Sequence, residues 1–213
     1  MGECDIVLAQ SKEFGLGLGM AAHVRAKARF EHTCIQSAAV MIGDDILEVS
    51  SHGDCLLNGV SNVDLPIKIG AEKCSLTKVA KNENAVTFNI EVSENDHIQV
   101  KAFKDLVSVR FVGAEEKQFC DVVGIMGNFQ NGTRLSRDGL SVIEDDNAFG
   151  QEWMVRPGQD PELFHFSPTN THQCLMPSAA KDARRAPGTD SSKCAWAVHD
   201  AIASSRHPVV RAG

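Results

Sequence analysis

The chain has 213 residues, and its 21 Lys and Arg against 28 Asp and Glu give a formal net charge of −7. This acidic balance argues against nucleic acid as a partner, because binding to phosphates requires a basic surface. The hydrophobic share of 43% is sufficient for a packed core and too high for a disordered chain. No run approaches the roughly 18 consecutive apolar residues that a membrane-spanning helix needs, so we expect no membrane span.

The acidic charge is concentrated in the first three quarters of the chain. Residues 156–213 contain seven Lys or Arg and five Asp or Glu, which leaves 14 basic and 23 acidic residues in 1–155. We therefore expect the folded domain to lie mainly in this acidic part.

The first 112 residues are typical of β-strands. Polar and apolar residues alternate over 23–30, which places the charged side chains on one face of a half-buried strand. Two hairpins are indicated, one with a turn at 43–45 and one at Asn58-Gly59, where the positive φ of a type I′ turn is favoured. Pro66 has no backbone N–H to donate, so it marks an edge strand or the start of a strand.

Three more β-rich runs follow, at 85–92, 98–103 and 106–112. Short strands with regular turn signals predict an antiparallel sandwich or barrel. The Gly-, Asn- and Asp-rich stretch 120–155 is expected to be a long structured loop with at most short strands, closed by Trp153 as a core anchor. Beyond it, two weakly helical segments within 178–206 predict a short helical appendage.

The motifs of known catalytic and nucleotide sites are absent from the sequence. The glycines at 15–19 lack the G-x-G-x-x-G spacing, so a flexible hairpin loop is the simpler interpretation. The eight histidines form no His-x-x-x-His pair, and no G-x-S-x-G elbow occurs. Cys120 with a distant histidine could form a nucleophile pair, but a buried half-cystine is the preferred interpretation.

Seven cysteines occur, with no Cys-x-x-Cys pair and no zinc-finger spacing. Their frequency favours an oxidising compartment, and their odd number leaves at least one thiol unpaired within the chain. No basic and apolar signal segment is present at the N-terminus, so the chain is either intracellular or a part of a longer exported protein.

The loop 127–139 combines Asn and Asp oxygens with glycines that permit tight turns. Ca²⁺ selects such oxygen ligands, although the same residues also simply cap turns. Asn131-Gly132-Thr133 is the only N-x-[ST] sequon and is a glycosylation site if the chain is secreted. A cation and a glycan on the Asn131 side chain would exclude one another.

Four segments, in order, resemble the von Willebrand factor type D domain. Residues 2–9 are similar to the family's "GECxYVLA" strand, and 37–49 to its central hairpin. Residues 124–132 resemble its "GLCGNFNG" signature, and 149–155 its closing "FGxxWxV". The resemblance implies two packed antiparallel sheets, hence an all-β sandwich, with a D-like domain at 1–175 that lacks the family's opening strand and a helical appendage at 176–213.

The resemblance also implies site residues. Calcium ligands would come from Asn128, Gln130 or Asn131, and Asp138. A disulfide would join Cys4 to Cys174, closing a loop of about 170 residues with a stabilisation of at most ~5 kcal/mol. Two further pairs remain open alternatives that the sequence does not fix, Cys55 with Cys74 and Cys34 with Cys120.

We therefore expect a non-enzymatic adhesion or assembly module that is extracellular or on the cell surface. Its partners would be other extracellular proteins or further domains of the same polypeptide. Two alternatives stay open: a calcium-binding structural module, and a part of a secreted enzyme whose pocket the sequence does not reveal. Two or more convergent titratable groups in a deep pocket would be required for the enzyme.

Overall fold

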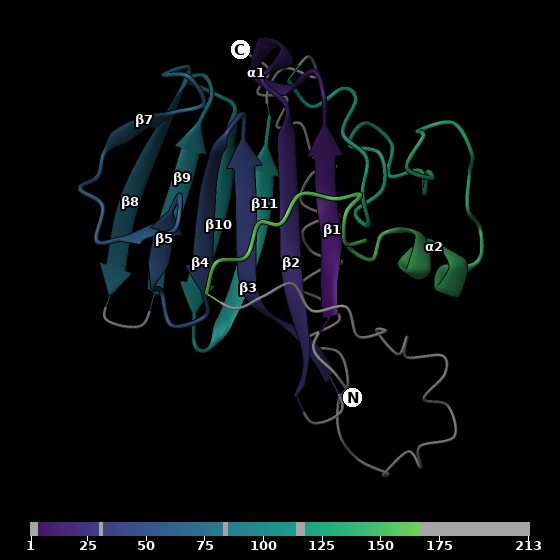
Figure 1. Ribbon diagram of the computed structural model, residues 1–213, viewed down its shortest axis with the longest axis horizontal. Coiled ribbons are helices and arrows are strands. Elements are labelled where there is room, and N and C mark those ends of the chain that lie inside the picture. The colour runs from purple at the N-terminus through teal and green to yellow at the C-terminus, as the bar shows by residue number, and fades with distance from the viewer. Residues whose placement is uncertain (1–3, 30–31, 83–84, 114–117, 167–213) are drawn as a thin grey trace, which may run out of the picture.

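The computed structural model describes residues 4–29, 32–82, 85–113 and 118–166 and has two antiparallel β-sheets packed face to face (Figure 1). The predicted all-β two-sheet sandwich is thereby confirmed. The helical appendage expected at 176–213 lies outside the described residues. Within the described part of the chain, no helix is long and apolar enough to cross a membrane.

The first sheet has six strands in the order of the sequence. They are β1 (Cys4–Ser11), β2 (Met20–Arg29), β3 (His32–Ile42), β4 (Asp45–Ser50), β5 (Cys55–Leu57) and β6 (Val60–Ser61). Both predicted hairpins are confirmed, because β3 pairs with β4 across the turn at 43–44 and β5 pairs with β6 across Asn58-Gly59. Asn58 and Gly59 have φ values of 53° and 77°, as a type I′ turn requires.

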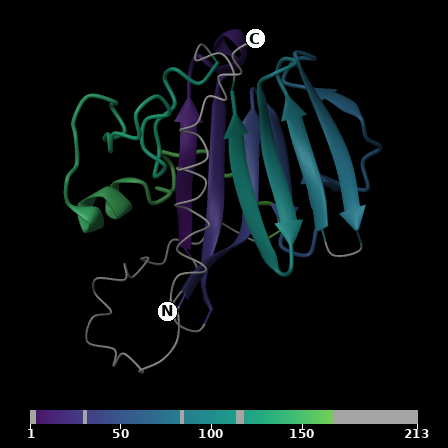
Figure 2. The ribbon, with the colours of Figure 1, turned by 180° about the vertical axis from the view of Figure 1, so that it is seen from behind.

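The second sheet has five strands, seen from its outer side in Figure 2. They are β7 (Ile67–Ile69), β8 (Cys74–Asn82), β9 (Ala85–Glu91), β10 (His97–Phe103) and β11 (Leu106–Val112). The three predicted β-rich runs correspond to β9, β10 and β11. Pro66 directly precedes β7, which is an edge strand, so the expectation for this proline is confirmed too.

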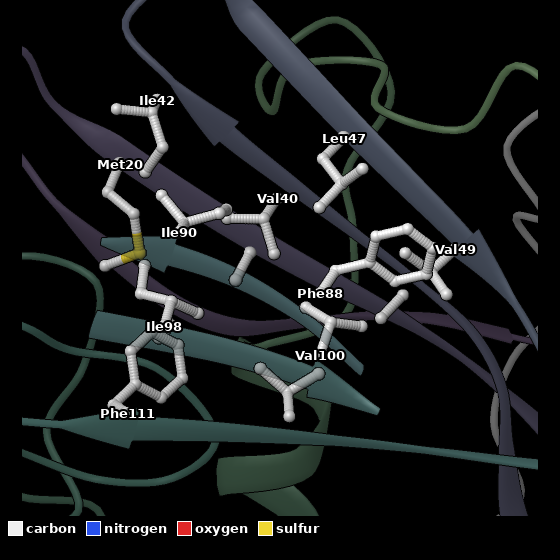
Figure 3. Close-up of a cluster of buried hydrophobic side chains, with 14 of the residues drawn as sticks. Met20, Val40, Ile42, Leu47, Val49, Phe88, Ile90, Ile98, Val100 and Phe111 are labelled. Atoms are coloured by element: carbon white, nitrogen blue, oxygen red, sulfur yellow. The ribbon is translucent and has the colours of Figure 1, made fainter. Parts of the chain in front are cut away.

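The main core lies between the two sheets (Figure 3). Met20, Val40 and Leu47 from the first sheet point toward Phe88 and Val100 from the second. Along β10, buried and partly buried residues alternate, because successive side chains of a strand point to opposite faces. The side chains that face inward are almost all aliphatic or aromatic, so burial of apolar surface holds the two sheets together.

Two short helices correct the expectations for the loops. The segment expected to be a flexible hairpin loop does connect the antiparallel strands β1 and β2, but it contains α1 (Phe14–Gly17). The Asp121 carboxylate anchors it by accepting hydrogen bonds from the backbone N–H groups of Lys12 and Glu13. The loop 120–155 contains α2 (Asp146–Glu152), which we did not predict. Asp145 caps α2, since its carboxylate accepts a hydrogen bond from the Ala148 N–H at 2.7 Å.

Residues 155–166, which we call the strap, cross the outer face of the first sheet (Figure 1). Leu163 and Phe164 pack there against Ala21 and Ala39. The alternation over 23–30 predicts charged side chains on one face of a half-buried strand; the strap covers this face at His23 and Arg25, whereas Lys27 is exposed. His23 and Arg25 are accordingly 2% and 4% exposed.

Candidate functional site

The outer edge of β1, which faces away from β2, is closed by two segments from much later in the chain. We call this region the β1 junction; it comprises 5–10, 123–126 and 153–155. Gln10 and Val123 exchange two backbone hydrogen bonds of 2.7 and 3.0 Å, and the Ile125 N–H donates to the Val7 carbonyl at 3.1 Å. The Val7 N–H donates to the Trp153 carbonyl at 2.8 Å, and the Val155 N–H donates to the Asp5 carbonyl at 2.9 Å.

Two side-chain features hold the β1 junction together. An ideal Cβ at Gly124 would lie 2.3 Å from the Leu8 carbonyl oxygen, so this position accommodates only glycine. Trp153 is fully buried, and its indole N–H donates to the Leu135 carbonyl at 3.0 Å. The expectation that Trp153 is a core anchor is therefore confirmed.

The β1 junction joins three of the four segments that resemble the von Willebrand factor type D domain. The first of them forms β1, and the segments at 124–132 and 149–155 each contribute backbone hydrogen bonds to it. The fourth segment, 37–49, forms the β3–β4 hairpin of the same sheet. Motifs that are widely separated in sequence are thus parts of one structural unit.

A layer of buried charges lies between the first sheet and the strap. The Arg25 guanidinium binds both Asp5 carboxylate oxygens, at 2.7 and 2.8 Å, with the Phe164 ring 4.4 Å from the guanidinium carbon. Glu48, which is 1% exposed, accepts hydrogen bonds from the backbone N–H groups of His165 and Phe166 at 2.5 and 3.1 Å. These charged groups bind parts of the chain itself, as buried charges must in a low-dielectric interior.

The buried charges also shift proton equilibria. Burial lowers the pKa of His23 from 6.5 to about 4, and the nearby Arg137 charge acts in the same direction. The carboxylates of Asp160 and Asp5 oppose this shift. Burial raises the pKa of Glu48, while the hydrogen bonds from the strap oppose that effect. At neutral pH the imidazole of His23, within this layer of buried charges, is therefore neutral.

The loop expected to bind calcium uses its side-chain oxygens to fix its own turns. Asn128 Oδ1 accepts from the Gln130 N–H and Asn131 Oδ1 from the Thr133 N–H, both at 2.9 Å. Asp138 lies in a separate turn, where its carboxylate accepts hydrogen bonds from Leu140 N–H and the Ser136 hydroxyl. These hydrogen bonds lower the pKa of Asp138.

The structure therefore divides the four candidate ligands, Asn128, Gln130, Asn131 and Asp138, between two turns. Among the described residues, no group of three or more His, Cys, Asp or Glu is arranged to hold a metal ion. Arg134, which follows the first turn, pairs with Asp146. The turn-capping role of the asparagines is observed directly, and calcium binding stays a prediction.

The cysteines correct two of the three disulfide expectations. Cys4 is disulfide-bonded, and both cysteines left as its partner, Cys174 and Cys194, lie outside the described residues. The pairing of Cys4 with Cys174 therefore stays a prediction. The remaining cysteines are thiols rather than half-cystines: Cys34, Cys55, Cys74 and Cys120.

The predicted Cys55–Cys74 pair is wrong because its members lie at opposite ends of the sandwich. Cys55 pairs with Val49, whereas Gly70, in the turn before Cys74, donates its N–H to Asp45 at the other end of β4. Four residues of strand separate these ends by roughly 13 Å, and a disulfide requires Cα atoms within about 7 Å. Burial raises the pKa of both thiols, so they stay protonated.

The predicted Cys34–Cys120 pair is wrong for the same reason. Cys34 lies opposite Lys27 near one end of β2, whereas Cys120 precedes Asp121, which binds Ser11 opposite Met20 at the other end. Seven residues of β2 span roughly 23 Å. Cys120 is also exposed rather than buried, which corrects its interpretation as a buried half-cystine.

One open pocket, with a volume of about 300 Å³, was not predicted. It is lined by Lys27, Cys34, Ile35, Gln36, Ser51, His52 and Asp105. His52 Nδ1 and Asp105 Oδ1 are 3.6 Å apart, but the side chains are 71% and 59% exposed, so water screens their interaction. The residues that line the pocket come from β2, β3 and two turns, and no spacing in the sequence indicates that they meet.

Gly124→Ala is expected to destabilise the protein by about 3 kcal/mol, the upper part of the range for overpacking, because the new methyl group collides with the β1 backbone. Gly139→Ala is the matched control. No atom lies within 4 Å of its new Cβ, and its positive φ of 73° costs only about 1 kcal/mol. Urea unfolding of the two variants and the wild type measures the difference; equal losses would show that the close contact at Leu8 is unimportant.

The free energy of unfolding is expected to fall as the pH is lowered from 6.5 towards 4. The unfolded chain then binds a proton at His23, whereas the folded protein keeps this imidazole neutral until about pH 4. The full effect is about 3 kcal/mol. His23→Gln should reduce this pH dependence, and His52→Gln, at an exposed histidine, should retain it. Urea unfolding across this pH range tests both, and an unchanged slope in His23→Gln would contradict the expectation.

If the loop binds calcium, millimolar Ca²⁺ should raise the melting temperature of the wild type, since a ligand that binds only the folded state stabilises it. The increase should vanish in Asn128→Ala and in Asp138→Ala. Because both substitutions also remove turn-capping hydrogen bonds, Mg²⁺ serves as the control ion for each variant. No increase in the wild type would exclude the calcium module.

The chain matches no protein-family model and no curated protein. The resemblance to the von Willebrand factor type D domain therefore rests on the four segments and on the meeting of three of them at the β1 junction.

Proposed function

We propose that this chain is a non-enzymatic extracellular module for adhesion or assembly, of the von Willebrand factor type D kind. The observation that carries the proposal is the β1 junction. Three segments that resemble successive signatures of that domain form one hydrogen-bonded unit, as expected if they descend together from one ancestral domain. Unrelated chance similarities would have no reason to meet on one strand.

The use of the buried charges supports a structural rather than a catalytic role. Asp5 and Arg25 neutralise one another, and Glu48 binds the strap backbone. The catalytic groups of an enzyme, by contrast, face a pocket from which water can be excluded. In the one pocket that we describe, the His52 and Asp105 side chains are mostly in solvent.

The state of Cys4 supports an extracellular location. Its disulfide starts at the first residue of β1, next to the β1 junction. Disulfides of this kind persist in oxidising compartments and are rare in the reducing cytosol. The function would be mechanical: a closed sandwich holds loops in fixed positions for a partner.

The loops outside the two sheets would supply the residues that contact a partner. Leu140 and Val142, on the turn between Leu135 and Ile143, are 84% and 61% exposed. Leu16, on α1, is also 84% exposed. Apolar side chains on hydrogen-bonded turns lose less entropy on binding than those on irregular loops, which suits them to contacts with other extracellular proteins or with neighbouring domains of the same polypeptide.

The proposal is tested with protein secreted by cultured cells. Sedimentation velocity measures self-association, and attachment of cells to a coated surface measures adhesion. The wild type and Gly158→Ala, whose new Cβ has no atom within 4 Å, should be active in at least one assay, whereas Gly124→Ala, which disturbs the β1 junction, should be weaker in the same assay. A folded wild-type chain that stays monomeric and supports no more attachment than a coating of albumin would overturn the proposal.

A further inference from the structure

We propose that Asn131 carries an N-linked glycan. This inference rests on the proposed extracellular function, because the modification is made in the secretory pathway. Asn131-Gly132-Thr133 satisfies the acceptor sequence N-x-[ST] with a glycine in the middle position. The β-sandwich itself does not require a modification here, so the glycan would be an additional feature of the surface.

The position of the Asn131 side chain suits this modification. The residue is exposed, and its Oδ1 accepts the Thr133 N–H at 2.9 Å. Nδ2, the atom that would bear the sugar, makes no hydrogen bond within the described part of the chain. A glycan on Nδ2 therefore breaks no interaction of the folded protein.

Backbone hydrogen bonds also close the turn around Asn131, beside those that the Asn128 and Asn131 Oδ1 atoms accept. The Gly132 N–H donates to the Asn128 carbonyl at 2.7 Å, and the Asn128 N–H donates to the Thr133 carbonyl at 2.8 Å. The long segment that includes this turn lies beside β1, clear of the outer face of the second sheet (Figures 1 and 2). A large substituent would thus extend into solvent without entering the core or lifting the strap.

The reaction is a group transfer from a lipid-linked oligosaccharide pyrophosphate. The bond between the sugar C1 and the pyrophosphate oxygen breaks, and a bond from C1 to Asn131 Nδ2 forms. The amide nitrogen loses one proton to the transferase, and the lipid pyrophosphate leaves. The hydroxyl of Thr133 is the part of the acceptor sequence that the transferase requires, so Asn131 and Thr133 are both needed.

A glycan would also change the calcium prediction. Asn131 is one of the candidate ligands, and a sugar attached to Nδ2 crowds the neighbouring Oδ1. The set would then be reduced to Asn128, Gln130 and Asp138, which already lie in two different turns. The glycan and a calcium ion are therefore competing uses of this loop.

The test expresses the full chain behind a cleavable secretory leader in mammalian cells. Electrophoretic mobility and intact mass are measured before and after peptide-N-glycosidase F, in both the cell lysate and the medium. The wild type should shift on treatment, and Asn131→Gln and Thr133→Ala should not. Thr133→Ser should still shift, and Asn128→Gln, at an asparagine outside the sequon, is the matched control.

Measuring both the cell lysate and the medium distinguishes a failure of this inference from a failure of the proposed function. Transfer takes place on entry into the endoplasmic reticulum, so a shift confined to the lysate supports the glycan even if the chain is retained. Secreted protein without a shift overturns the glycan and leaves the extracellular function intact. Lysate protein whose intact mass shows that the leader has been removed, but which carries no sugar, overturns the glycan equally. A shift that persists in Asn131→Gln shows that the glycan is elsewhere.

Discussion

The outer edge of β1 is closed by two segments from the far end of the described chain, and the rest of the architecture depends on this closure. Without 123–126 and 153–155, β1 would expose a row of unpaired backbone groups. The same contacts bury Trp153 and direct the chain into the strap, which covers the outer face of β2 and β3. One strand thus connects the sandwich, the long loop and the strap.

The strap turns an ordinary two-layer sandwich into a partly three-layered one. Its backbone binds Glu48, and its Phe164 ring covers the Arg25 guanidinium. Ionised groups are rarely buried in this way unless they are paired, since an unpaired buried charge is strongly destabilising. The charge layer therefore specifies where the strap lies, while the apolar core supplies most of the stability.

Local signals in the sequence predicted the local structure well. Asn58-Gly59 and the turn at 43–44 are short-range signals, and both hairpins form as expected. The sequence did not reveal that the charged face of β2 is covered, because the residues that cover it are far away in the chain. For the same reason spacing misassigned Cys55 and Cys74, whose positions at opposite ends of the sandwich depend on the whole topology.

The connectivity has a consequence for synthesis on the ribosome. Both sheets are meanders in which each strand pairs with its neighbour in sequence, so they can assemble progressively as the chain emerges. The outer edge of β1 is the exception, since its partners are among the last described residues to be made. During elongation this edge is a bare template for pairing with another nascent chain. Once Trp153 has been synthesised, its segment pairs with β1 and covers this edge.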